Sequence, residues 1–368
     1  MGSDFISLAT CGVQNLNPYL PGKPPEELER ELGLTNVVKL ASNENPMGPS
    51  EKVLSALQKS LSGLSLYPDS GGYKLKHALS KKFGFSPEQV TLGNGSNDVL
   101  ELIGRGYLNP GDEVIYSEFS FVVYSLVTQA TGAKPIVTPA KSWGNDLNAM
   151  LQAVSEKTRI IFIANPNNPT GTWLTKQEIT SFLDAVPENV LVVLDEAYTE
   201  YVDEAEFPNG LSLLSSYQNL IVTRTFSKAY GLAGLRIGYA VSNTEIANIL
   251  SRVRQPFNVN NLALVAAETA LDDDEYLSKS FALNKAGMAL YQAELKRLGL
   301  NFIPSVGNFI TVELENDAAP VYQAMLEEGV IVRPVANYGM PKHLRISIGL
   351  DAENKRCIEV LERVIKHE

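Results

Sequence analysis

Short apolar runs recur along the middle of the chain, and each is followed by a polar loop and a segment with helical periodicity. The clearest runs are residues 159–164, 189–194 and 219–223. Continuous apolar runs of this length are typical of strands that are buried on both faces, as in parallel sheets covered by helices. The alternation over residues 46–255 therefore predicts an α/β fold with a mostly parallel, doubly wound sheet.

The pattern changes after Pro256, where helical segments are followed by further strands. With 368 residues the chain is longer than most single domains, so we expect two. The later segments, with strands expected within 302–313, at 330–333 and at 343–349, predict a smaller α+β domain. The predicted division is an N-terminal arm that is part of the small domain (1–45), a large domain (46–255) and a small C-terminal domain (256–368).

Composition excludes several classes of protein. The net charge of -11 and the pI near 5.0 argue against a nucleic-acid surface. The two cysteines, Cys11 and Cys357, are too few for a disulfide framework or a zinc site, so no metal is expected. We find neither a signal peptide nor an apolar run long enough to span a bilayer. The sequence therefore predicts a cytoplasmic protein without a membrane partner.

Lys228 lies five residues beyond the apolar run 219–223, among small and hydroxylated residues. A lysine at such a place can lose its hydration and become nucleophilic, as Schiff-base chemistry requires. Thr225, Ser227 and Arg236 around it suit a phosphate group. On these residues alone, a surface lysine beside a strand remains the alternative.

Two other strand ends carry candidate site residues. Gly93-Asn-Gly-Ser-Asn97 precedes a helix, and free backbone N–H groups at a helix start can bind an anion. The further glycine spacing of a dinucleotide site is absent. Asp195 follows the run 189–194, at the end of a strand where open parallel sheets place ligands. A buried carboxylate there needs a cationic partner, although structural acids are also common at strand ends.

Three ordered motifs connect these residues. The segment from Ser227-Lys228 to Arg236-Ile-Gly238 resembles the cofactor-lysine signature of fold-type I pyridoxal-phosphate aminotransferases. Asn165-Pro-Asn-Asn-Pro-Thr-Gly171 and Asp195-Glu-Ala-Tyr198 lie upstream of it in that family's order. The resemblance covers nearly the whole chain and is closest to the histidinol-phosphate aminotransferase branch.

The resemblance implies a catalytic group of three residues. Lys228 would hold pyridoxal 5'-phosphate as a Schiff base and then move the proton of the reaction. Asp195 would keep the pyridine nitrogen protonated. Tyr198, together with Asn168, would hydrogen-bond the phenolic oxygen of the cofactor.

The resemblance also implies how the rest of the cofactor is held. Phe121 would stack on the pyridine ring, where the family commonly has tyrosine; an aromatic core residue is the alternative. Tyr67 would reach the phosphate of the partner subunit's cofactor, which predicts a homodimer with shared active sites. The predicted ligands of the phosphate within one chain are Ser96, Asn97, Thr225, Ser227 and Arg236.

Substrate binding is expected mainly from arginines. Arg345 alternates with Leu344 and Ile346 and so points away from the apolar face of its predicted strand. In the resembled family this arginine binds the anionic group of the substrate, for which its planar fork is suited. The complete set that the resemblance implies is Tyr19, Asn43, Asn308, Arg333 and Arg345.

The resemblance implies transfer of an amino group from histidinol phosphate to 2-oxoglutarate, giving imidazole acetol phosphate and glutamate in histidine biosynthesis. The same motifs would serve an aromatic amino-acid aminotransferase or a decarboxylase of a phosphorylated amino acid. The fold also occurs in regulators fused to DNA-binding modules. A regulator of that kind requires a basic winged-helix segment, whereas only a short arm precedes the first motif and the chain is acidic. Partners are therefore expected to be a small-molecule amino donor, a 2-oxo acid and a second copy of the chain.

Overall fold

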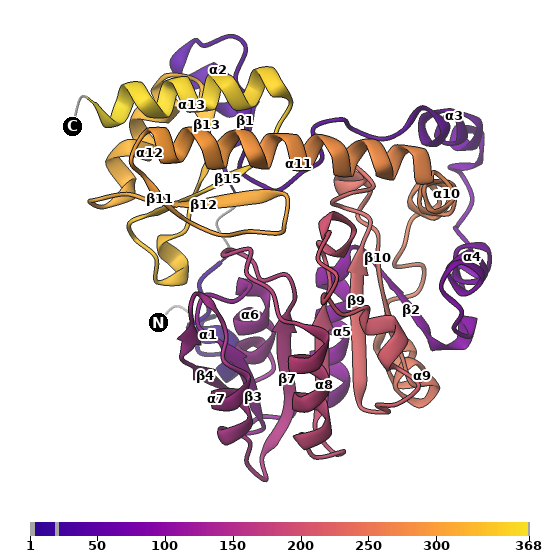
Figure 1. The fold of residues 1–368 in the computed structure, drawn as a ribbon. Coiled ribbons are helices and arrows are strands. Elements are labelled where there is room, and N and C mark those ends of the chain that lie inside the picture. The colour runs from indigo at the N-terminus through magenta and orange to yellow at the C-terminus, as the bar shows by residue number, and fades with distance from the viewer. Residues whose placement is uncertain (1–3, 19–21, 367–368) are drawn as a thin grey trace.

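The computed structural model describes residues 4–18 and 22–366, and its centre is a seven-stranded sheet (Figure 1). The strand order is β2-β10-β9-β8-β7-β3-β4. Strands β4, β3, β7, β8 and β9 run parallel to one another, and β10 is antiparallel to both of its neighbours, β9 and β2. The strands are β2 (Val90–Gly93), β3 (Glu113–Ser117), β4 (Lys134–Thr138), β7 (Thr158–Ala164), β8 (Leu191–Asp195), β9 (Leu220–Thr225) and β10 (Gly238–Ser242).

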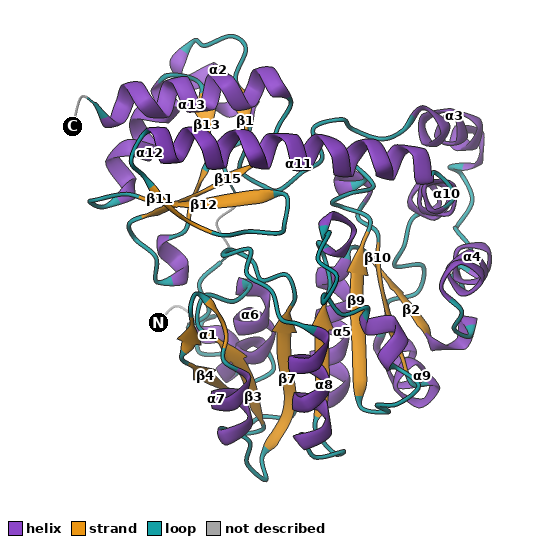
Figure 2. Cartoon of the chain, viewed as in Figure 1, coloured by secondary structure: helices purple, strands orange, loops and turns teal. Residues whose placement is uncertain are grey.

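Helices cover both faces of this sheet, which explains the continuous apolar runs (Figure 2). Ile161 and Ile163 pack into a core on one face, and Phe162 packs into a core on the other. The first core also receives α3 (Glu51–Ser60), α4 (Tyr73–Phe83), α7 (Leu147–Gln152), α8 (Lys176–Ala185) and α10 (Asn261–Leu271). The second core receives α5 (Ser96–Tyr107), α6 (Val122–Ala130) and α9 (Thr244–Val253). The predicted α/β, doubly wound fold is confirmed.

A second, four-stranded sheet has the order β11-β12-β15-β14 and is antiparallel throughout. Its strands are β11 (Asn301–Ile303), β12 (Phe309–Glu313), β14 (Arg333–Pro334) and β15 (His343–Ser347). Its core includes residues of three helices: α11 (Asp274–Arg297), α12 (Ala318–Glu327) and α13 (Asp351–Ile365). The domain boundaries after residues 45 and 255 stay a prediction.

The N-terminal segment packs against this second unit. β1 (Val38–Lys39) pairs in parallel with β13 (Val330–Ile331), so the predicted strand 330–333 is in fact divided between two sheets. Leu28 of α2 (Pro25–Leu32) is buried against Leu326 and Ile331. The short helix α1 (Cys11–Gln14) lies near α6 instead. The remaining regular elements are the hairpin β5 (Ala140–Lys141) and β6 (Gly144–Asn145) and the 3₁₀ turns η1 (Leu61–Gly63), η2 (Pro87–Gln89), η3 (Thr199–Tyr201), η4 (Gly210–Leu213), η5 (Ala233–Leu235) and η6 (Ala336–Tyr338).

Local sequence signals account for several helix ends. Ser50 caps α3 by accepting a hydrogen bond from the Val53 N–H, and Thr175 forms a capping box with Glu178 at the start of α8. Gly33 ends α2 in the left-handed conformation, at φ 66°. None of the helices in the described part of the chain is both long and apolar enough to cross a membrane.

Candidate active site

Parallel strands β7, β8 and β9 end at one edge of the large sheet, where a cavity of about 380 Å³ opens toward the second sheet. Because carboxyl ends of parallel strands meet at the same edge, motifs far apart in the sequence converge there. The predicted site residues that line the cavity are Asn43, Ser96, Asn97, Phe121, Asn168, Asp195, Tyr198, Thr225, Ser227, Lys228, Arg236, Arg333 and Arg345.

Lys228 follows β9 by three residues, and its side chain faces this cavity. Its Nζ donates a hydrogen bond to the carbonyl oxygen of Ser42 at 3.0 Å. Burial, and to a smaller extent the positive charge of Arg345, lower the pKa of Lys228 to about 8. The amine is thus nucleophilic nearer to neutral pH than that of a surface lysine.

Asp195 is the last residue of β8 and is buried. Its Oδ2 accepts a hydrogen bond from the Tyr124 hydroxyl at 2.8 Å, and its Oδ1 accepts one from Thr223 at 3.0 Å. No ion pair of this carboxylate is found within the ranges that the structure describes. Burial raises the pKa of Asp195, and the two hydrogen bonds oppose that shift. The carboxylate therefore fits a ligand that brings a protonated nitrogen.

Tyr198 lies three residues beyond β8 and lines the same cavity. Asn43 Nδ2 donates to the Tyr198 hydroxyl at 2.9 Å. Burial raises the pKa of Tyr198 to about 12, although Arg345 acts against this shift. The phenol thus stays protonated at neutral pH and can donate to a ligand oxygen.

One end of the cavity is built for an anion. Ser96 and Asn97 open α5, so their backbone N–H groups have no carbonyl partner one turn earlier in the helix. Arg236 lies beside them, and its Nη1 donates to Ser227 Oγ at 3.4 Å. A Cβ on Gly95 would clash with the Arg236 guanidinium, so glycine lets this charge reach the helix start. Main-chain donors, hydroxyls and an arginine together suit a phosphate.

Phe121 precedes α6 and meets Tyr124 edge to face, with ring centroids 5.9 Å apart. The Phe121 ring lines the cavity rather than filling the core completely. Such a position allows a flat ring of a ligand to stack on it. Stacking on a cofactor stays a prediction.

Two arginines lie opposite one another on neighbouring strands, because Arg333 of β14 pairs with Arg345 of β15. Arg345 is buried and donates from Nη2 to the Ala41 carbonyl oxygen at 2.8 Å and from Nη1 to Asn168 Oδ1. Its guanidinium lies 5.4 Å from the centroid of the Phe309 ring. This pairing places two permanent positive charges at the end of the cavity formed by the second sheet.

Three predicted site residues lie elsewhere. Asn308 is buried behind the cavity, where its Nδ2 donates to the Asn43 carbonyl oxygen at 3.0 Å, so within one chain it positions the 43–44 loop. Tyr67 is 82% exposed and stacks on Phe257 at 4.6 Å between ring centroids. Tyr19 lies outside the described residues. Substrate or cofactor contacts of all three stay predictions.

Further residues, outside the predicted site set, also shape the site. Tyr124 and Thr223 orient Asp195, and Ser42, Glu44 and Tyr338 line the cavity. A sequence signal for Thr223 was present, because it ends the run 219–223 much as Asp195 follows the run 189–194; in the structure the two residues pair in the register of β8 and β9. Among the described residues, no group of three or more His, Cys, Asp or Glu side chains is arranged to hold a metal ion.

Comparison with known proteins places this site in a family. The family model "Aminotransferase class I and II" matches residues 35–361, which is most of the chain. The chain belongs to the class I and II aminotransferases. This membership confirms the family predicted from the three motifs.

The curated relatives extend over the full length. "Histidinol-phosphate aminotransferase 2" of Pseudomonas fluorescens Pf-5 is 58% identical over 367 residues, covering 99% of both chains. The protein of the same name from Pseudomonas aeruginosa is 56% identical and covers 100% of both. The predicted histidinol-phosphate branch of the family is therefore confirmed.

Solved structures agree with this placement. Histidinol-phosphate aminotransferase from Sinorhizobium meliloti, in complex with pyridoxal-5'-phosphate, superposes with a TM-score of 0.90 at 31% identity and covers 97% of both chains. A double mutant of Thermus thermophilus aspartate aminotransferase has a TM-score of 0.84 at 23% identity, covers 96% of this chain and 99% of its own, and so supports the fold alone.

Proposed function

We propose that this aminotransferase transfers the amino group of histidinol phosphate to 2-oxoglutarate, giving imidazole acetol phosphate and glutamate in histidine biosynthesis. The observation that carries the proposal is full-length identity of 54–58% to curated proteins of that name. The cavity supports it with a nucleophilic lysine, a buried carboxylate and two arginines. A cytoplasmic location is part of the proposal.

The residues of the cavity fit pyridoxal 5'-phosphate. Lys228 suits its carbonyl carbon, the helix start at Ser96 with Arg236 suits its phosphate, and Asp195 suits its ring nitrogen. The fit is strongest at Asp195, whose buried carboxylate has hydrogen-bond donors but no ion pair in the described part of the chain. When bound, the cofactor supplies the electron-withdrawing ring that stabilises negative charge at the substrate carbon.

The side chains of this chain do the remaining work. Lys228 Nζ takes the proton from the amino-bearing carbon of the donor, and in the second half of the reaction it gives a proton to the carbon of 2-oxoglutarate that receives the amino group. Asp195, oriented by Tyr124 and Thr223, holds a positive charge at the inner end of the cavity. Tyr198, which stays protonated, donates to a ligand oxygen with Asn168 beside it.

Arg345 and Arg333 are proposed to bind the phosphate of histidinol phosphate and a carboxylate of 2-oxoglutarate in turn. Both ligands carry anions, and arginine binds phosphate and carboxylate with two parallel hydrogen bonds. Aromatic amino acids are a second candidate class of donor, because Phe121 and Tyr338 also line the cavity.

Replacing Arg333 with Gln is expected to separate these donors. We expect kcat/KM for histidinol phosphate to fall about 100-fold, since a charged partner of the phosphate is lost. The value for phenylalanine should change less than about threefold if its carboxylate is bound mainly by Arg345. Steady-state rates with both donors test this, with Arg333→Lys as the matched variant that keeps the charge. Equal losses for both donors would contradict selective phosphate binding by Arg333.

The pKa of Lys228 predicts how the apoenzyme captures its cofactor. Only the neutral amine attacks a carbonyl, and a pKa of about 8 makes that form dominant above pH 8. The observed rate of cofactor attachment should therefore rise with pH, with a midpoint near 8. Stopped-flow absorbance of apoenzyme mixed with pyridoxal 5'-phosphate between pH 6.5 and 10 measures it. A midpoint near the ordinary lysine value of 10.5 would show that the Lys228 pKa is not lowered.

We propose a homodimer in which Tyr67 of one subunit contacts the cofactor phosphate of the other. Its high exposure and its absence from the lining of the cavity of its own chain support this. Mixing Tyr67→Ala with Lys228→Ala subunits should then restore activity, because one site of each mixed dimer combines the intact Lys228 with the intact Tyr67. Statistical mixing of a two-fold dimer predicts recovery to about a quarter of wild type at limiting cofactor. Activity no higher than the mean of the two parents would argue against sharing.

A further inference from the structure

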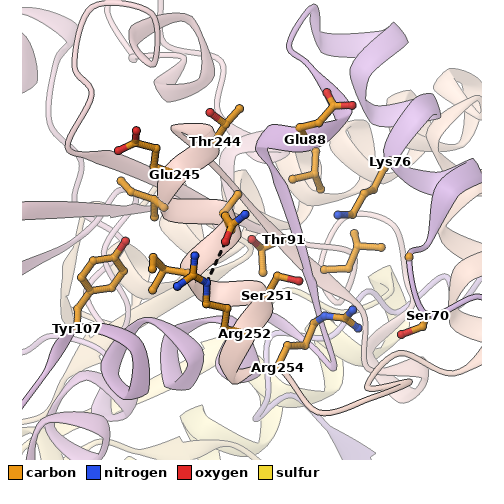
Figure 3. A pocket seen from close by; sticks show the side chains of 17 residues that line it. Ser70, Lys76, Glu88, Thr91, Tyr107, Thr244, Glu245, Ser251, Arg252 and Arg254 are labelled. Atoms are coloured by element: carbon orange, nitrogen blue, oxygen red, sulfur yellow. Dashed lines mark hydrogen bonds between the residues drawn. The ribbon is translucent and has the colours of Figure 1, made fainter.

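A second cavity, of about 910 Å³, lies beside the edge strand β2 and shares no lining residue with the first (Figure 3). Its walls come from α4, the turn η2, the end of α5 and helix α9. It is therefore a separate site on the flank of the large sheet, away from the strand ends where Lys228 and Asp195 meet.

Three cations line this cavity. Arg252 of α9 donates from Nε to a side chain on its own helix. The other two are Lys76 of α4 and Arg254, which follows just after α9. Within the described residues, neither is found in an ion pair. Figure 3 shows the Lys76 ammonium turned toward the cavity and the Glu88 carboxylate turned away from it. Glu88 instead accepts a hydrogen bond from Ser86.

Lys76 and Arg254 are close enough for their positive charges to interact. Burial lowers the pKa of Lys76, and the positive charge of Arg254 lowers it further, whereas Glu88 and Asp69 act in the opposite direction. Asn258 Oδ1 accepts a hydrogen bond from Arg254 Nη1 at 2.8 Å and so holds the guanidinium in place. The fold thus keeps two like charges near each other, which costs stability unless an anion joins them.

Thr91 of β2 provides an independent indication of a ligand. Its side chain lines the cavity and is only 4% exposed, yet its Oγ1 has no hydrogen-bond partner among the described residues. A buried hydroxyl is almost always hydrogen-bonded, so an unpartnered one at a cavity wall requires an explanation. In Figure 3 it lies between Lys76 and helix α9.

We propose that this second cavity binds phosphate or a small phosphate monoester through Lys76, Arg254 and the Thr91 hydroxyl. An ammonium, a guanidinium and a hydroxyl provide hydrogen-bond donors in several directions, as the oxygens of a phosphate require. The cavity has room for an organic group beyond the phosphate, with Tyr107 and Ile246 on its walls. The assignment does not depend on the reaction proposed for the first cavity.

Calorimetric titration of the cofactor-loaded enzyme with inorganic phosphate, in chloride buffer, tests the site. The Arg333→Gln background weakens anion binding in the first cavity, so the remaining isotherm reports mainly on the second. In this background we expect Lys76→Gln and Arg254→Gln each to weaken binding at least about tenfold. Thr91→Val, which keeps the side-chain shape, should weaken it about threefold to tenfold.

Lys74→Gln is the matched control, because Lys74 lies exposed on the same helix and does not line the cavity. Its isotherm should equal that of the background enzyme. In phosphate-free buffer, Lys76→Gln should also melt at the same or a higher temperature, since it removes an unpaired, half-buried charge. Phosphate binding that is unchanged by Lys76→Gln and Thr91→Val, or absent altogether, would overturn the proposal.

Discussion

Replacing Lys228 with Ala is expected to lower kcat by at least about 10⁴-fold, the upper range for loss of a positioned proton-transfer group alone. Lys228 is the amine at the centre of the cavity, and its pKa of about 8 makes it both nucleophile and base near neutral pH. No other lysine lines the cavity among the described residues, so no side chain replaces it. Single-turnover rates with histidinol phosphate measure the loss without interference from product release.

Two controls separate chemistry from folding. Lys228→Arg keeps the positive charge but removes a nucleophile that can be deprotonated, so it should be as inactive as Lys228→Ala. Both variants should still bind pyridoxal 5'-phosphate without a covalent bond, because Arg236, Ser227 and the start of α5 remain. Turnover of either variant within tenfold of wild type would contradict the role given to Lys228.

Asp195→Asn is expected to lower kcat by about 10²–10³-fold, as for loss of one preorganised electrostatic group at a reacting centre. Asparagine has nearly the same shape and can still bond Tyr124 and Thr223, but it lacks the negative charge that would hold a proton on the cofactor ring. Turnover with histidinol phosphate and the ¹⁵N shift of ring-labelled cofactor provide two readouts. Loss of turnover with an unchanged, protonated ring nitrogen would refute the electrostatic explanation.

Tyr124→Phe and Thr223→Val are the matched variants, since each removes one hydrogen bond to the Asp195 carboxylate and leaves its charge. A hydrogen bond to a charged group contributes about 1.5–3 kcal/mol, so each should cost less than Asp195→Asn and shift the ring nitrogen pKa only slightly. If either variant lowered kcat as much as Asp195→Asn does, the position of the carboxylate, rather than its charge, would be decisive.

The part of the site on the large sheet could be predicted because its residues lie at the ends of strands. Asp195 and Lys228 each follow an apolar run, and parallel strands bring such ends to one edge. Thr223 could have been added from the same pattern, because it ends the run 219–223. The hydrogen bond that orients Tyr198 could not have been predicted, because its donor Asn43 comes from the N-terminal segment. Only the three-dimensional packing brings the two residues together.

The half on the smaller sheet was less predictable for a physical reason. Local sequence favours one strand over 330–333, but the chain changes sheets there, so that β13 pairs with β1 and Arg333 pairs with Arg345. Non-local pairing of this kind is not encoded in hydrophobic periodicity. The resemblance implies that Asn308 binds substrate, and this contact stays a prediction; that its amide also donates to the Asn43 and Glu44 carbonyl oxygens could be learned only from the structure.

Single-turnover mixing tests the central claim most directly. Cofactor-loaded enzyme is mixed with histidinol phosphate, phenylalanine or tyrosine in the absence of any 2-oxo acid, and the visible absorbance of the lysine-bound cofactor is followed. We expect rapid loss of this band with histidinol phosphate, with imidazole acetol phosphate formed in an amount equal to that of the enzyme sites. Faster reaction with the aromatic amino acids, or no visible band after cofactor is added, would contradict this expectation.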